Sequence, residues 1–399
     1  MNFALAKTEH AQALPALPIA RGWSIELAQN LEIAEAPWRE LMRGECFGTA
    51  FQDFDLCALW LRHVGAPAGY APAIVVGRDR DGRAAFLWPL VSRRLAGCRV
   101  ASVFCGRHAN FGATLWRRDI ANSVTAEDLQ SILTGLASSG IDALALLNQP
   151  AELNGVPNPF LLLPHSNAPD KSYSLTLEGT GEEIIGRHFN ADTRRKLRRK
   201  ERHLARLPGF RYVRAANRSE AERFVSEFMR QKAARLAARG IGNAFDEPGM
   251  DAFLRAASLS GLSCGSPLIE IHALQSDDDL LALFAGIHDR DTFSTMFNSY
   301  TLSDNARMSP GLILLMKLVD DCARRGFRTL SLGIGAAEYK QSLCDRAELP
   351  FDTTIGLTVR GHVFARATRA FRAAKGTIKN NQRLWRLVTG LRAKFFART

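Results

Sequence analysis

The stretch that decides the fold is ARMSPGLILLMKLVDDCARRGFRTLSLGIGAAEYK, residues 306–340, which predicts a loop, a long helix and a strand in succession. The Ser-Pro-Gly run at 309–311 marks the helix entrance, because a proline at the first helical position lacks an N–H that would be unpaired there anyway. Gly326 suits the left-handed residue that closes many helices. Apolar residues at alternate positions of 327–335 indicate a short buried strand, and a short helix is expected from Glu338.

The rest of the second half extends this stretch into the order β-α-α-β-β-β-α-β-α-β. The other expected elements are a strand at 210–216, helices at 218–240 and 249–261, a hairpin at 268–289, and strands at 292–301 and 352–361. Antiparallel strands that lead into a helical crossover predict a mixed sheet.

The first half repeats this plan as a pattern, without a long run of shared residues. Its expected elements are a hairpin at 72–94, a strand at 99–106, a helix at 126–140 and a strand at 141–148. Such repetition predicts two copies of one α/β unit, joined near 157–172. The predicted division is a leader at 1–22, a first domain at 23–168, a second domain at 169–361 and basic amphipathic helices at 362–399.

The composition is typical of a globular protein, with 399 residues, 46% hydrophobic and 23% charged. No apolar run approaches the roughly 20 residues that a membrane-spanning helix needs, and the N-terminus lacks the basic start and continuous apolar core of a secretory signal. The seven cysteines are scattered and never spaced as CxxC. This spacing argues against a disulfide framework or a zinc site, so we expect a cytoplasmic protein without a bound metal.

The net charge of +12 is concentrated in two segments, 187–206 and 361–399. The first holds nine Lys/Arg against two acids, without the interleaved aromatics or motifs of a nucleic-acid-binding module. It is therefore a solvated face or a phosphate contact, and DNA is not an expected partner. In the second, an apolar stripe within 376–399 is flanked by basic residues. That stripe either lies on an anionic membrane surface, at the periphery of the inner membrane, or docks on a protein.

The order of elements resembles that of GNAT-type N-acyltransferases, and three short motifs narrow the resemblance. SPG at 309–311, EYK at 338–340 and the Arg-rich helix TRRKLRRKERHLARLPGF at 193–210 are similar to the BioF2-like (CelD-like) acetyltransferases, relatives of the FemAB peptidoglycan aminoacyltransferases. The resemblance spans most of 45–360. It implies an α/β fold of tandem GNAT-like domains, each a mixed, mostly antiparallel sheet flanked by helices, the first domain being degenerate.

The same resemblance implies an N-acyltransferase that moves an acyl group, acetyl by expectation, from acyl-CoA to an amine by direct attack. Acyl-CoA would be a co-substrate, with no tightly bound cofactor, and the setting would be envelope or exopolysaccharide biosynthesis. Two alternatives stay open. The Arg-rich helix favours Fem-like transfer from aminoacyl-tRNA, whereas a non-catalytic adaptor is favoured by RMSPGLI and GIGAAEYK, which lack one glycine and one aspartate of the family patterns.

The candidates for binding the donor share a position at a helix start or on the Arg-rich helix. Free N–H groups and the partial positive charge of a helix N-terminus suit a phosphate, although an ordinary helix cap explains the same residues. The candidates are Arg307, Ser309, Pro310, Gly311, Arg195 and Arg199.

The catalytic candidates are Lys340, Tyr339, His288 and Tyr300. Lys340 would neutralise a phosphate or a developing oxyanion, or is a solvated lysine. Tyr339 would protonate the leaving thiolate, or packs; since neighbours on a helix point apart, at most one of these two faces the site squarely. His288 is a possible base for the amine or a turn residue, and Tyr300 ends the following strand.

The candidates for binding the acceptor come from both halves. His108 and Asn110 occupy the matching loop of the first half, where they would line a cleft between the domains or serve as turn residues. Asp304 lies in the loop before the long helix, and Glu338 lies after the strand that follows it.

Overall fold

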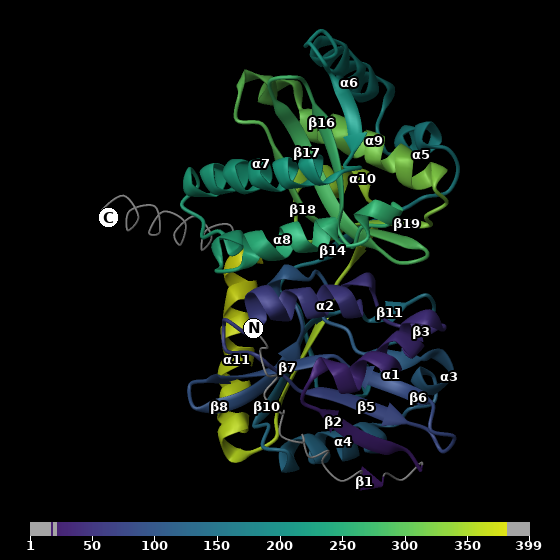
Figure 1. The fold of residues 1–399 in the computed structure, drawn as a ribbon, viewed down its shortest axis with the longest axis vertical. Coiled ribbons are helices and arrows are strands. Elements are labelled where there is room, and N and C mark those ends of the chain that lie inside the picture. Colours follow the sequence, from purple (N-terminus) through teal and green to yellow (C-terminus); the bar gives the residue numbers. More distant parts are fainter. Residues whose placement is uncertain (1–16, 19–21, 381–399) are drawn as a thin grey trace, which may run out of the picture.

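The computed structural model of the protein describes residues 17–18 and 22–380 and contains two α/β units stacked along the long axis (Figure 1). Most of the predicted leader and all of the apolar stripe between Leu384 and Phe395 lie outside these residues. Among the described residues, no helix combines the length and the apolar character needed to cross a lipid bilayer.

The first unit contains an antiparallel sheet of order β1-β2-β5-β6-β9-β3, a mixed sheet of order β13-β21-β10-β8-β7-β4 and the two-stranded sheet β11-β12, with helices around them. Its elements are β1 (Leu17–Pro18), β2 (Ser24–Ala28), α1 (Leu31–Arg43), β3 (Cys46–Phe47), α2 (Phe54–Trp60), β4 (Ala71–Pro72), β5 (Ile74–Arg78), β6 (Ala84–Trp88), β7 (Leu90–Leu95), β8 (Cys98–Val103), β9 (Leu115–Arg117), α3 (Arg118–Ala121), α4 (Ala126–Ser138), β10 (Ala143–Gln149), β11 (Glu152–Leu153), β12 (Val156–Pro157) and β13 (Ser166–Asn167).

The second unit is built on one seven-stranded sheet of order β15-β16-β17-β18-β19-β14-β20. Its elements are β14 (Ser172–Thr176), α5 (Gly181–His188), α6 (Ala191–Leu204), β15 (Arg211–Arg214), α7 (Arg218–Ala237), α8 (Met250–Leu259), β16 (Glu270–Gln275), β17 (Leu280–His288), β18 (Thr292–Tyr300), α9 (Pro310–Arg324), β19 (Thr329–Ile334), α10 (Glu338–Leu343) and β20 (Arg346–Glu348); β21 (Phe351–Gly356) and α11 (Val359–Asn380) follow.

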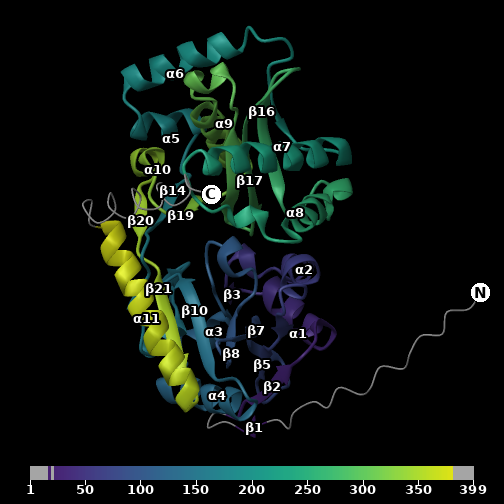
Figure 2. The ribbon, with the colours of Figure 1, turned by 90° about the vertical axis from the view of Figure 1, so that its left-hand side faces the viewer.

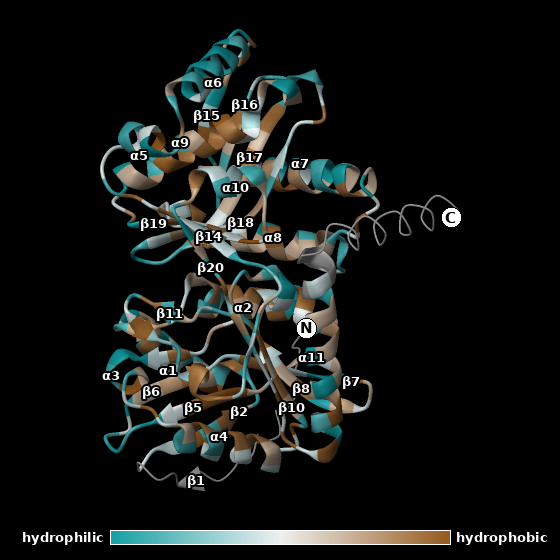
Figure 3. Cartoon of the chain, turned by 180° about the vertical axis from the view of Figure 1, so that it is seen from behind, coloured by the Kyte–Doolittle hydropathy of each residue, from teal (hydrophilic) through white to brown (hydrophobic). Residues whose placement is uncertain are grey.

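Burial on both faces explains why the strand β17, LLALFAGIH, is apolar throughout instead of alternating. Its side chains alternate between two apolar clusters: Phe284 packs with α9, and Leu283 packs with Phe224 and Phe228 of α7. Figure 3 shows the contrast between the hydrophobic strands of this sheet and the hydrophilic helix α6 above them.

Both units contain the predicted crossover from a strand through a helix to a parallel strand. In the second unit β18 and β19 are parallel and flank α9 in sequence, and in the first β8 and β10 are parallel and flank α4. The repeat predicted from pattern is therefore present in three dimensions.

The structure corrects the prediction in one respect, since the last strand does not stay with the second unit. β21, expected at 352–361 within a domain at 169–361, pairs antiparallel with β10 of the first unit. The strand β14, which was not among the predicted elements, begins the second unit and lies between β19 and β20. The helix α11 then packs along β21, β10 and β8, on the side of the lower unit (Figure 2). The strand β21 and the helix α11, which follow the second unit in sequence, therefore belong to the first unit.

The two units also share a hydrophobic core. One cluster of buried side chains contains Phe51 and Trp60 of the first unit together with Phe228 and Phe253 of the second, and α2 packs on α8. A shared apolar core of this kind holds two domains in one orientation.

A buried polar network joins β15, β16 and the end of α9. Tyr212 Oη donates to His272 Nδ1 (2.7 Å), and His272 Nε2 donates to Glu270 Oε1 (2.6 Å). Arg325 donates to both carboxylate oxygens of Glu270, with 3.0 Å between Nη2 and Oε2. Because this carboxylate already has a guanidinium and an imidazole partner, the group serves as a structural ion pair.

Candidate functional site

The site lies where the parallel strands β18 and β19 separate. They pair only over Thr292–Ser294 and Thr329–Ser331, and β18 then runs on to Tyr300 with an irregularity in its pairing to β17 at Met296. A side chain of the first unit enters this opening: Asn110 Nδ2 donates to Thr295 O at 2.7 Å.

Gly333 of β19 makes room for that side chain. Its φ is +73°, and a Cβ added there would lie 2.5 Å from Asn110 Nδ2. Asn110 therefore sits between the two strands, with a hydrogen bond to one and against the backbone of the other. The first unit thus helps to hold open the sheet of the second.

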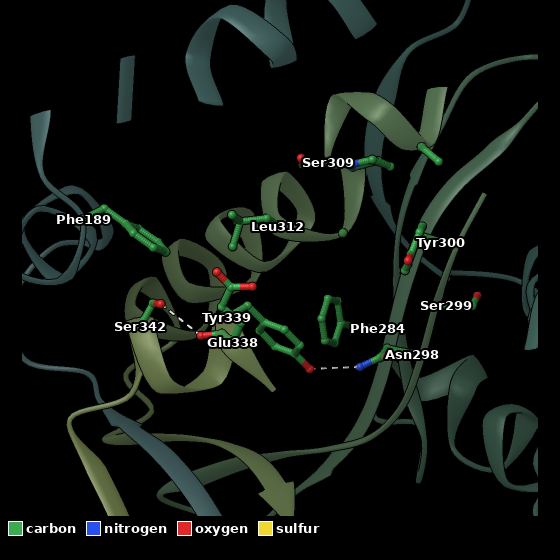
Figure 4. A pocket seen from close by; sticks show the side chains of 13 residues that line it. Phe189, Phe284, Asn298, Ser299, Tyr300, Ser309, Leu312, Glu338, Tyr339 and Ser342 are labelled. Atoms are coloured by element: carbon green, nitrogen blue, oxygen red, sulfur yellow. Dashed lines mark hydrogen bonds between the residues drawn. The ribbon is translucent and has the colours of Figure 1, made fainter. Parts of the chain in front are cut away.

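A first cavity of about 530 Å³ lies on the α9 face of the sheet (Figure 4). Its walls are the end of β18, the start of α9, and α10. It is of the size that small-molecule and cofactor sites commonly have. Its lining includes Phe189, Phe284, Asn298, Tyr300, Ser309, Pro310, Gly311, Leu312, Glu338 and Tyr339.

The start of α9 at this cavity is not an ordinary helix cap. Ser309 has left-handed backbone angles, φ 55° and ψ 47°, and its hydroxyl makes no capping hydrogen bond. Instead the hydroxyl accepts from Lys200 Nζ at 2.8 Å, so that a cation from α6 lies at the helix N-terminus. A Cβ added at Gly311 would have only Tyr300 within 4.0 Å, which leaves the backbone accessible from the cavity. An uncapped helix start beside an ammonium suits an anionic group such as a phosphate.

A second, smaller cavity of about 190 Å³ lies on the opposite face, between the units. Its lining includes Asn110, Lys232 of α7, Phe245, Phe297 and Lys340. Lys340 Nζ donates to the carbonyl oxygens of Gly333 and Ile334, both at 3.3 Å. Burial lowers the pKa of Lys340 to about 8, so a minor fraction of this amine is neutral near physiological pH and the rest is the ammonium.

Asn298 is common to both cavities. Its side-chain Nδ2 lies 3.4 Å from the hydroxyl of Tyr339 in the first cavity (Figure 4), whereas its carbonyl oxygen accepts from Lys232 Nζ at 3.3 Å in the second. Tyr339 lines the first cavity and Lys340 the second. Burial raises the pKa of Tyr339, which keeps its hydroxyl protonated. Tyr339 and Lys340, which are consecutive residues of α10, thus face different cavities at the opening between β18 and β19.

The matching family model covers this part of the chain. Residues 191–341 match the acetyltransferase (GNAT) domain. This segment is therefore similar to a GNAT domain. It contains the opening between β18 and β19, most of both cavities and the start of α9, and such a domain is that of an acyltransferase enzyme. No curated protein matches the chain significantly.

Solved structures share the architecture at low sequence identity. FemX has a TM-score of 0.53 at 8% identity over 77% of this chain and 96% of its own. A protein of unknown function from Bacteroides thetaiotaomicron has 0.52 at 9% over 82% and 97%. The C-terminal domain of a putative lysylphosphatidylglycerol synthetase from Agrobacterium fabrum has 0.50 at 10% over 88% and 97%. These likenesses show the fold, and the predicted tandem GNAT-like α/β class is confirmed.

Eight of the predicted site residues line one of the two cavities. The first cavity contains Tyr300, Ser309, Pro310, Gly311, Glu338 and Tyr339, and the second contains Asn110 and Lys340. The expectation that Tyr339 and Lys340 point apart agrees with the geometry, with the addition that each faces a cavity of its own.

The remaining candidates lie elsewhere. His288 pairs with Phe293, at the opposite end of β18 from Tyr300, which at the rise of a strand is about 20 Å away. His108 is buried between the units, with Nε2 3.1 Å from Glu247 Oε2.

The charged candidates on the surface have partners there or face solvent. Arg307 pairs with Asp304 at 3.2 Å on an exposed loop, and Arg195 pairs with Asp192 at 3.0 Å. Arg199 is exposed on α6 and does not line the first cavity. Their sequence positions did not distinguish them from residues that reach the site.

Three residues at the site were not predicted. Lys200 could have been found, because it shares the buried face of α6 with Leu197 and Leu204 at helical spacing. Asn298 and Lys232 could not, since an isolated asparagine in a strand and one lysine in a long helix carry no pattern.

Proposed function

We propose that the protein is an N-acyltransferase that moves an acyl group, acetyl in the simplest case, from acyl-CoA to an amine. The observation that carries this proposal is the pair of cavities on opposite faces of one sheet, which meet at Asn298. A donor in the first and an acceptor in the second approach each other only where β18 and β19 separate. Holding two reactants in this way supplies much of the catalysis of a direct transfer.

The donor would lie along the first cavity with its phosphates at the start of α9. Lys200 and the N–H groups of that helix end supply positive charge there. The thioester end would reach towards Asn298 and Tyr339, at the far side of the cavity from Ser309 (Figure 4).

The reaction would proceed without a covalent enzyme intermediate. The amine nitrogen attacks the thioester carbon, the C–S bond breaks, and the amine loses a proton. Lys340 in its neutral form accepts that proton, because its pKa of about 8 suits a base near neutral pH. Tyr339 donates its proton to the leaving sulfur, and the side-chain amide of Asn298 is placed to donate to the developing oxyanion.

The biological setting is proposed from the SPG and EYK motifs, which resemble BioF2-like and CelD-like proteins. They support a cytoplasmic enzyme of envelope or exopolysaccharide biosynthesis.

Thermal stabilisation by acetyl-CoA tests the donor site. We expect a rise in Tm of several degrees for the wild type at saturating ligand. Gly311→Glu, which places a carboxylate at the helix start, and Lys200→Ala should each weaken binding by about 10- to 100-fold. Lys196→Ala, on the exposed side of the same helix, is the matched control. Unchanged stabilisation in both site variants would exclude a phosphate at this helix start.

A second candidate is transfer from aminoacyl-tRNA, which one feature of α6 favours. Arg194, Arg195, Arg198 and Arg202, together with Glu201, line a single depression along that helix, and four arginines in such a row suit a phosphate backbone. Binding of acyl-CoA and aminoacyl-tRNA should therefore be measured side by side. An adaptor without activity would bind neither ligand. Tighter binding of aminoacyl-tRNA than of acyl-CoA would favour the Fem-like reaction over transfer from acyl-CoA.

A further inference from the structure

The second cavity contains two lysines, Lys232 and Lys340, for which the described chain supplies no carboxylate within ion-pair distance. The Lys340 side chain is only 8% exposed, and Lys232 is half-buried. Among residues 17–18 and 22–380, neither forms an ion pair with a carboxylate within 4.0 Å. Their hydrogen-bond acceptors are all backbone carbonyl oxygens, those of Gly333 and Ile334 for Lys340 and that of Asn298 for Lys232.

Other charged groups near the cavity add to its positive charge. Burial lowers the pKa of Lys232, and Arg235 and Arg239 lower it further. Lys232 is itself one of the groups that lower the pKa of Lys340, whereas Cys344 and Asp170 act in the opposite sense. The aromatic face of Phe245, whose centre is 5.8 Å from Lys232 Nζ, is a further neutral neighbour.

Two uncompensated ammonium groups in one small cavity are costly. Desolvating a charge without an opposite partner opposes folding, so the pair has no evident stabilising role in the free protein. An anion bound in the cavity would supply the missing partner. An acceptor amine alone would not, because its protonated form is repelled by both lysines.

We propose that the second cavity binds an acceptor that carries an acidic group, a carboxylate or a phosphate, in addition to the reacting amine. Lys232 binds the acidic group, and Lys340 faces the amine. The cavity of about 190 Å³ equals only about six waters at liquid density. The amine and the acid are therefore separated by a few bonds, as in an amino acid or a phosphorylated amino alcohol or sugar. The assignment of this ligand as the acceptor rests on the proposed function.

Calorimetric binding to the full-length protein without donor tests the acid requirement. Two matched pairs distinguish the sources: β-alanine against β-alaninamide for a carboxylate, and phosphoethanolamine against ethanolamine for a phosphate. We expect the acidic member of at least one pair to bind about 10- to 100-fold more tightly than its neutral partner. Lys232→Met should abolish this preference, and Lys232→Arg should retain it. Lys196→Met on the exposed face of α6 is the control.

The inference is overturned if neutral and acidic members bind equally, if neither acid binds, or if Lys232→Met keeps the preference while remaining folded by circular dichroism. Release of free thiol from acetyl-CoA, measured with the same amines, separates this result from the fate of the proposed function. If the acid binds through Lys232 but no thiol is released, the anion site is supported and the acyltransferase function is refuted. If neutral amines release as much thiol as acidic ones, and Lys232→Met as much as the wild type, the acyltransferase function is supported and the anionic acceptor is refuted.

Discussion

Replacing Lys340 by methionine should change how the stability of the protein depends on pH. Burial lowers the pKa of this ammonium from 10.5 to about 8. At about 1.36 kcal/mol for each unit, the shift corresponds to about 3 kcal/mol between the folded and unfolded states. Methionine keeps the unbranched shape and removes the titration.

The sign follows from proton binding. Between pH 8 and 10.5 the unfolded chain keeps a proton on Lys340 that the folded chain has lost, and stability rises with pH wherever the unfolded state binds more protons. The free energy of unfolding of the wild type, relative to Lys340→Met, should therefore be nearly flat below pH 7. It should rise by about 2.5 kcal/mol between pH 7 and pH 10.

Urea denaturation of both proteins at pH 7, 8, 9 and 10 measures this difference directly. At pH 7 the variant loses two hydrogen bonds to carbonyl oxygens, about 1 kcal/mol each, and no longer buries a charge, so its stability should be close to that of the wild type. For the exposed Lys196→Met control the difference should change by less than about 0.5 kcal/mol over the same range. A flat curve for Lys340→Met would refute a lowered pKa and with it the role of Lys340 as a base.

Three further predictions concern other parts of the molecule. Burial by itself raises the pKa of Glu270, but hydrogen bonds from its partners bring it from 4.5 down to about 2; the stabilisation of wild type over Glu270→Gln, present above pH 4.5, should fall by about 3 kcal/mol towards pH 2 in denaturant melts. Gly333→Ala should destabilise the protein by about 2 kcal/mol, since it adds a Cβ at a positive φ and against Asn110, and by less in an Asn110→Ala background. His288→Ala should leave turnover within about twofold of the wild type, because this residue lies at the other end of β18; a loss of about 100-fold would return it to the site.

Local pattern was sufficient for most elements of the second unit, but not for β14, α5 or β20. The apolar period of 310–324, the Ser-Pro-Gly entrance and the glycine after the helix predict α9 because each acts within a turn or two of chain. The same reasoning located β16, β17, β18 and β19 and, through their order, the crossover that creates the opening. Tyr300, Gly311 and Tyr339 were predicted at the site because they lie at the ends of these elements.

What the sequence by itself determined is therefore the α/β repeat, the helix entrance at 309–311 and the short helix that begins near Glu338. Only the tertiary structure decided which strands belong to which sheet, because β14 and β21 pair with partners about 150 to 210 residues away, and β21 joins a sheet of the first unit. It also decided the chemistry of the second cavity. Asn110, Lys232 and Lys340 come from three distant segments, and a lysine becomes a weak base or an anion ligand only when folding has removed the water and the acids around it.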